Sequence, residues 1–166
     1  MEILIVKKFM HNYIVKIRSQ ILVYLTHKMA LPILKKMRKA EIFPYTLVEL
    51  KKMPLGTLGY DMYKFLEIKK LELLPSYAKH DIKHILLGYD TTDEGEVCLQ
   101  CFMLGNKHIS FPVAATVFYG FFTMPEYWGK FIAAYKRGAK CNPIQDWNWV
   151  TLLKQNTLKL KQIIND

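Results

Sequence analysis

Two histidines and two carboxylates in this chain are spaced as in a metal-binding motif. His80, Asp81 and His84 form a His-Asp-x-x-His run, and eleven residues separate His84 from Glu96. Residues four apart on a helix lie on one face about one turn apart, so both imidazoles can converge on one ion at roughly 2 Å. A carboxylate from a following segment completes a two-histidine, one-carboxylate set. Such a set leaves positions open for water or substrate, as in catalytic zinc and non-haem iron sites.

Each of these residues also has an ordinary structural interpretation. A histidine pair four residues apart commonly just packs or faces solvent. Asp93 followed by Glu96 fits a capping arrangement that would start a helix without any metal. Asp81 could be a first-turn carboxylate favoured by the helix dipole, or it could ligate, hold an imidazole or act as an acid–base group. The pattern lacks the Glu of His-Glu-x-x-His, so we discount peptidase activity.

The motif lies within a longer pattern that extends through several segments. They are Tyr77-Ala78-Lys79-His80-Asp81-Ile82-Lys83-His84, Leu87-Gly88-Tyr89, Gly95-Glu96, Phe102-Met103-Leu104-Gly105-Asn106, Ser110-Phe111-Pro112-Val113 and Met124-Pro125-Glu126-Tyr127-Trp128. Together they resemble bacterial members of the ubiquinone (coenzyme Q) biosynthesis protein 4 family, whose signature is His-Asp-x-x-His, eleven residues and Glu. The resemblance covers roughly residues 55–150.

The resemblance implies a mostly helical fold and a divalent metal, zinc or else iron, with His80, Asp81, His84 and Glu96 as ligands. Asp81 would complete the metal shell or shuttle protons as a catalytic residue. Family members are implicated in oxidative removal of the ring C1 carboxyl group of prenylated quinone precursors at a membrane surface. They are also described as organisers of a multi-enzyme complex. The two expected functions are therefore a metal-dependent enzyme and a non-catalytic lipid-binding scaffold with a structural metal.

The implied partners are a prenylated quinone precursor or related prenyl lipid, the membrane surface, other quinone-biosynthesis enzymes and, in one arrangement, a second copy of the chain. We expect a cytoplasmic protein, peripheral to the inner face of the cell membrane. Charges interrupt the apolar N-terminus within a few residues, which argues against a signal peptide.

Helical periodicity dominates the chain, and no long alternating strand pattern competes with it. Helices are predicted over residues 3–31, 58–69, 76–87, 94–104, 113–122, 123–138 and 150–164. Pro75 suits the first turn of the helix that carries the motif, and Gly88 suits its left-handed end. Thr123 and Glu126 form a capping signal for the next-to-last helix. The sequence thus predicts one compact all-α domain over 1–166, with a basic amphipathic segment at 1–41 and the family-like core at 55–150.

The charge of the chain gathers at its N-terminal end. Net charge is +10, and residues 1–41 hold nine Lys or Arg against two Glu. A basic amphipathic helix either solvates its polar face or binds anionic lipid. Neither a nucleic-acid recognition motif nor a basic stripe with interleaved aromatics is present in the rest of the chain, so no nucleic-acid partner is expected.

The longest stretch without a charged residue or a histidine runs for 17 residues, from Ile109 to Pro125. It barely reaches the length of a membrane span and contains Pro112, which favours a buried or interfacial helix. Its aromatic residues could form a buried central helix or the wall of an apolar tunnel for a prenyl chain. The predicted lipid-binding residues are Phe118, Tyr119, Phe122 and Trp128.

Cys98 and Cys101 have no second pair for a structural zinc site and are interpreted as helical core thiols.

Overall fold

The computed structural model describes residues 13–21, 24 and 43–166. Backbone contacts divide the chain into two units, Met1–Ala40 and Glu41–Asp166. Most of the predicted basic segment 1–41 lies outside the described residues. Residues 13–21 are helical, as the periodicity predicts. Their apolar stripe is open to solvent, with Ile14, Ile17 and Ile21 all exposed.

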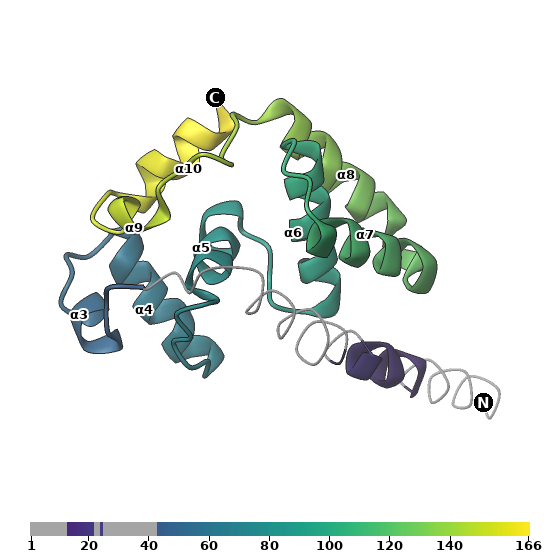
Figure 1. The fold of residues 1–166 in the computed structure, drawn as a ribbon, viewed down its shortest axis with the longest axis horizontal. Coiled ribbons are helices and arrows are strands. Elements are labelled where there is room, and N and C mark those ends of the chain that lie inside the picture. The colour runs from purple at the N-terminus through teal and green to yellow at the C-terminus, as the bar shows by residue number, and fades with distance from the viewer. Residues whose placement is uncertain (1–12, 22–23, 25–42) are drawn as a thin grey trace, which may run out of the picture. The chain divides into compact units, whose positions relative to one another are not determined.

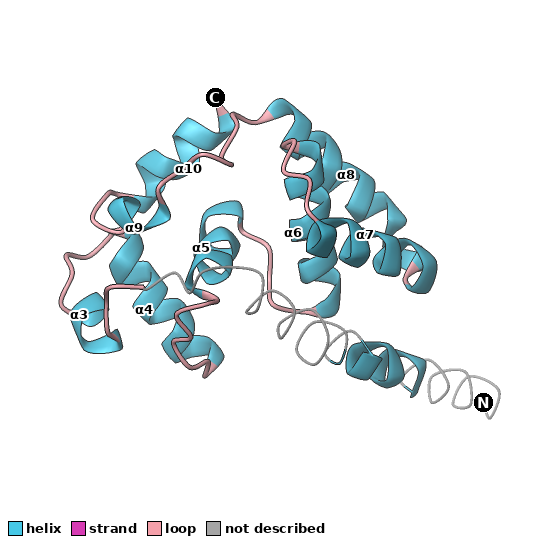
Figure 2. Cartoon of the chain, in the orientation of Figure 1, coloured by secondary structure: helices cyan, strands magenta, loops and turns pink. Residues whose placement is uncertain are grey.

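The described part of the second unit is built from helices, which confirms the all-α prediction (Figures 1 and 2). The helices are α3 (Leu47–Lys51), α4 (Leu58–Lys69), α5 (Ala78–Leu87), α6 (Asp93–Gly105), α7 (Phe111–Thr123), the 3-10 turn η2 (Pro125–Tyr127), α8 (Trp128–Lys140), α9 (Trp149–Leu152) and α10 (Thr157–Asn165). One isolated bridge joins Thr57 to Asn156 and ties the start of α4 to the start of α10.

Local capping chemistry sets most of these helix bounds. The Thr57 side chain accepts from the Tyr60 N–H at the start of α4, and Lys70 ends that helix at φ 54°. The predicted helix 58–69 is therefore confirmed at both ends. The helix predicted at 76–87 begins two residues later, at Ala78, and ends as expected because Gly88 takes the left-handed conformation at φ 74°.

Two predicted features of the helix pattern are wrong, and one helix was not predicted. Thr123 does not start a helix: it is the last residue of α7, and its hydroxyl donates to the Tyr119 carbonyl at 2.8 Å. The predicted helix 150–164 is two helices, because the Asn156 side chain caps α10 afresh by accepting from the Lys159 N–H at 3.1 Å. The short helix α3 was not predicted, although Thr46 and Glu49 form a capping box there.

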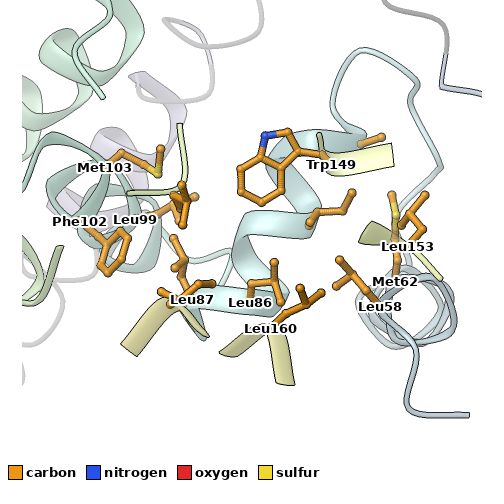
Figure 3. Close-up of a cluster of buried hydrophobic side chains, with 14 of the residues drawn as sticks. Leu58, Met62, Leu86, Leu87, Leu99, Phe102, Met103, Trp149, Leu153 and Leu160 are labelled. Atoms are coloured by element: carbon orange, nitrogen blue, oxygen red, sulfur yellow. The ribbon is translucent and has the colours of Figure 1, made fainter. Parts of the chain in front are cut away.

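The core has two clusters of buried side chains, and α6 contributes to both. The larger one joins α4, α5, α6, α9 and α10 through Leu58, Met62, Leu86, Leu87, Leu99, Phe102, Met103, Trp149, Leu153 and Leu160 (Figure 3). The smaller one packs the opposite side of α6 against α7 and α8, through Val97, Cys98, Cys101, Met124, Phe131 and Ala134. Burial on two sides fixes α6 firmly, and α6 carries Glu96.

Close backbone approach between α6 and α8 requires glycine on both helices. A Cβ added to Gly105 would lie 2.1 Å from the Tyr135 carbonyl oxygen, and one added to Gly138 would lie 2.1 Å from the Phe102 carbonyl oxygen. Neither neighbour is a movable side-chain end, so α6 and α8 could not pack this closely with any larger residue. The contact holds α8 beside the C-terminal half of α6.

Helix α7 differs from the buried central helix that its composition could have formed. Only Val113 and Gly120 of its thirteen residues are buried. Phe111, Phe118 and Phe122 are 76%, 66% and 73% exposed. Among the described helices, none combines the length and hydropathy needed to cross a bilayer.

Candidate metal centre

Two consecutive helices, α5 and α6, position the motif residues. His80 and His84 lie one turn apart on α5, whose start is set by a turn in which the Tyr77 and Ala78 N–H groups donate to the Leu74 carbonyl. Glu96 lies in the first turn of α6, which begins after the cap residue Thr92. The five-residue connection between the helices, residues 88–92, starts at the left-handed Gly88 and turns the chain back, so that Glu96 faces the two imidazoles.

The three ligand atoms converge closely. The Nε2 atoms of His80 and His84 are 3.1 Å apart. The Glu96 carboxylate lies 3.1 Å from Nε2 of His80 and 3.0 Å from Nε2 of His84. Ligands about 2.0–2.1 Å from a tetrahedral zinc ion are roughly 3.3–3.5 Å from one another. The observed spacing is within a few tenths of an ångström of that value, so the donor set fits a small divalent ion. In the described part of the chain, these three residues are the cluster that could hold a metal.

His84 has the ring orientation that a metal ligand requires. Its Nδ1–H donates to the Tyr89 backbone carbonyl at 2.9 Å, so Nε2 is the nitrogen that faces Glu96 and His80 and that would bind a metal. The side chain of His84 is fully buried, and the Phe65 ring from α4 stacks on it with centroids 6.2 Å apart. The side chains of His80 and Glu96 keep 30% and 28% exposure, so a small molecule could reach the site from their side.

The capping interpretation of Glu96 is wrong. The cap of α6 is Thr92, whose side chain accepts from the Gly95 N–H at 3.1 Å. Asp93 is therefore the first helical residue, and Glu96 is one position too far along to close a capping box. Its carboxylate bonds to the two histidines instead.

Asp81 lies apart from the converging atoms. Its side chain is not among the three gathered by the structure, although the residue is only 8% exposed. Consecutive residues are about 100° apart around a helix, so Asp81 cannot share the face of His80 and His84. Burial raises the pKa of Asp81 to about 6, against the opposing effect of the two histidines. Its predicted roles as ligand and proton shuttle stay predictions.

The Glu96 carboxyl group carries a negative charge at neutral pH. Burial alone would raise the pKa of this carboxyl, but hydrogen bonds from His80 and His84 outweigh it and lower the pKa to about 2.

Tyr77 lies against His80 with ring centroids 6.2 Å apart. Burial, with the charges of Glu96 and Asp81, raises the pKa of Tyr77 to about 12, so its hydroxyl stays protonated. Sequence reasoning did not assign a role to Tyr77, Tyr89 or Phe65. Tyr77 and Tyr89 do lie in the family-like segments.

The remaining predicted residues are divided between surface and interior. Phe118, Phe122 and Trp128 are exposed, whereas Tyr119 packs against the smaller core cluster. The Trp128 Nε1–H donates to the Phe121 carbonyl at 2.7 Å, which holds that ring at the α7–α8 corner.

Cys98 and Cys101 are buried in α6, as predicted, and burial raises the pKa values of their thiols to about 11 and 12. They are inert core thiols at neutral pH.

Metal affinity is expected to fall as the pH is lowered through the neutral range. Burial disfavours a charged His84, but Glu96 outweighs it and raises the pKa of His84 above 6.5. Metal binding must displace the proton of His84. Below the pKa of His84, the metal affinity therefore falls about tenfold for each pH unit. We expect more than a tenfold weaker Co²⁺ affinity at about pH 5.5 than at about pH 7.5. Glu96 stays ionised throughout this window. Chelator competition at several pH values measures the effect, and a flat profile would contradict it.

Comparison with known proteins adds a fold-level relationship. No family model matches the chain, and no curated protein matches its sequence. A crystal structure of a protein from Nostoc punctiforme, provisionally named a ubiquinone biosynthesis protein, matches with a TM-score of 0.58. The match has 20% sequence identity and covers 92% of this chain and 81% of that chain. At this identity the likeness shows a shared fold.

Proposed function

We propose that this protein is a metal-dependent enzyme of prenylquinone biosynthesis, which binds one divalent cation through His80, His84 and Glu96. The observation that carries the proposal is the convergence of two Nε2 atoms and one carboxylate, with His84 held in the metal-binding tautomer by the Tyr89 carbonyl. The shared fold with the Nostoc punctiforme protein, whose name refers to ubiquinone biosynthesis, supports this choice of pathway.

The proposed reaction is oxidative removal of the ring carboxyl group from a prenylated aromatic precursor. The carboxyl carbon leaves as carbon dioxide, water supplies the hydroxyl group that the ring carbon gains, and dioxygen takes up the two electrons and two protons that are released, as hydrogen peroxide. A bound zinc or iron ion would supply electrophilic assistance to the ring carboxylate or to oxygen or water beside it. Three protein ligands leave room for such a group. Asp81 would move a proton, because a carboxyl with a pKa of about 6 changes protonation near neutral pH.

Turnover with an isotopically labelled carboxyl group tests this function. Metal-loaded protein, a prenylated aromatic acid and dioxygen should release labelled carbon dioxide, and the His84→Ala variant should release none. Labelled carbon dioxide from metal-free or His84→Ala protein would refute the proposal. Lipid binding without turnover, together with unfolding on chelation, would favour the scaffold function with a structural metal.

We propose further that the exposed face of α7 binds the prenyl lipid and its membrane. Phe111, Phe118 and Phe122 lie within about 40° of one another around the helix axis, since they are seven and four residues apart. The Phe118 and Phe122 ring centroids are 4.4 Å apart. Helix α7 contains no charged residue. An exposed aromatic stripe of this kind suits insertion at the lipid headgroup boundary.

Placing a charge on this stripe should weaken vesicle binding. Burying one phenylalanine contributes about 1.5–3 kcal/mol, so Phe122→Asp should reduce partitioning into anionic vesicles at least roughly tenfold. Leu158→Asp is the matched control, because Leu158 is 71% exposed on α10. Vesicle co-sedimentation measures the effect, and circular dichroism checks the fold. Unchanged vesicle binding by Phe122→Asp, with a dimer converted to monomer in light scattering, would assign the stripe to a second copy of the chain instead.

A further inference from the structure

Arg137 on α8 contacts the end of α5 and the connection that follows it, and also reaches α6 and α10. Its Nη1 donates to the Leu87 carbonyl at 2.7 Å. Its guanidinium lies over the Tyr89 and Phe102 rings, at 5.5 Å and 5.2 Å from their centroids. A longer bond of 3.4 Å runs from Nη2 to the Asn165 side chain. The side chain is half-buried, and Leu87 is fifty residues away in sequence.

These contacts fix the end of α5. Leu87 is the last residue of the helix, and its carbonyl is one of the four that have no partner within the helix. Arg137 supplies that partner. The planar guanidinium also holds the ring of Tyr89, which leans on Phe102 of α6 with centroids 6.2 Å apart. Lysine could not make the same contacts, because it lacks the planar fork that bonds and stacks at once.

Tyr89 joins this clamp to the ligand set. Its ring lies under the guanidinium, while its backbone carbonyl accepts the Nδ1–H of His84 at 2.9 Å. The direction of that carbonyl determines which nitrogen of His84 carries the proton. Gly88, immediately before Tyr89, has a positive φ of 74°, and glycine restricts the backbone less than any other residue. Gly88 therefore does little to fix the direction of the Tyr89 carbonyl, and the contacts of the Tyr89 ring have to fix it.

We infer that Arg137 is a positioning residue of the metal centre, acting through the Gly88–Tyr89 turn to hold His84 in the tautomer that presents Nε2. The inference rests on the proposed metal centre and adds a residue that does not touch the ion. Groups that orient metal-bound histidines typically contribute about 10–100-fold to metal affinity.

A matched pair of substitutions on α8 tests the role. Arg137→Gln and Lys136→Gln each remove one positive charge from adjacent residues, and Lys136 is exposed. In metal-free protein, long-range proton–nitrogen correlation spectra report the tautomer of His84 at a pH where the ring is neutral. Arg137→Gln should lose the single Nδ1–H tautomer and bind Co²⁺ at least about tenfold more weakly, whereas Lys136→Gln should match the wild type.

The outcomes separate this inference from the metal proposal. An unchanged His84 tautomer and unchanged Co²⁺ affinity in Arg137→Gln, with only lower thermal stability, would overturn the positioning role. Failure of the wild type itself to bind Co²⁺ would overturn the metal centre, before any variant is compared. If Arg137→Gln does not fold, Tyr89→Leu replaces it, since it removes the clamped ring and keeps the carbonyl. Tyr89→Leu should then show the same mixed tautomer, and a wild-type spectrum would refute the inference.

Discussion

His84→Gln is expected to lower the affinity of the protein for divalent metal at least about 100-fold, because it removes one of three ligands and leaves a pair that cannot enclose an ion. His84 is the most constrained ligand. Its side chain is fully buried, its Nδ1 is bonded to the Tyr89 carbonyl, and its Nε2 lies 3.0 Å from Glu96 and 3.1 Å from His80. The substitution to glutamine keeps much of the side-chain volume, so loss of metal is not confused with a cavity in the core.

Cobalt titration with a chelator as competitor measures this effect. His108→Gln is the matched control, because it changes the same residue type outside the ligand cluster. His84→Gln should give no cobalt absorption at concentrations that saturate the control and the wild type. Equal cobalt affinity in both variants would mean that the histidine pair only packs.

Asn106→Ala is expected to destabilise the fold by about 3 kcal/mol, because it leaves several buried backbone groups without partners. The Asn106 amide donates to the carbonyls of Gly138, Cys141 and Asn142, and its oxygen accepts from the Ile144 N–H at 3.0 Å. The residue is 3% exposed, so water cannot replace these bonds. Asn106 thereby ties the end of α6 to the chain that follows α8.

Denaturant unfolding compares this variant with Asn156→Ala. Asn156 is an exposed cap of α10, and loss of such a cap typically costs about 1 kcal/mol. The Asn106 variant should therefore lose roughly three times as much unfolding free energy as the control. A loss no larger than that of the control would show that the carbonyls and the Ile144 N–H find other partners.

Local signals in the sequence predicted the features that depend on neighbouring residues. Two histidines four residues apart lie on the same face of a helix, whatever that helix packs against. Gly88 ends the helix because glycine is the residue type that adopts a φ of 74° without strain. The start of α4 follows from Thr57, whose hydroxyl accepts from the Tyr60 N–H. Glu96 was the harder residue, since its neighbour Asp93 suggested a cap. The true cap, Thr92, is one residue earlier and leaves Glu96 free to face the histidines.

Features set by distant residues could not be predicted in this way. The contact between Arg137 and the Leu87 carbonyl joins residues on different helices, and no periodicity indicates it. The exposure of α7 depends on which helices cover it, so an apolar composition that favoured a buried helix could not reveal an exposed one. Asp81 shows a different difficulty. The resemblance named it as a ligand, whereas helix geometry turns it about 100° from the histidine face.

Elemental analysis of the purified protein beside a His80→Ala, His84→Ala double variant tests the central claim most directly. The account predicts about one zinc or iron ion per chain in the wild type and none in the variant, since both Nε2 donors are removed while the rest of α5 is kept. The identity of the element would also distinguish zinc-based from iron-based chemistry. Absence of metal from both proteins, with circular dichroism and unfolding unchanged, would contradict the metal centre and leave His80 and His84 as packing residues.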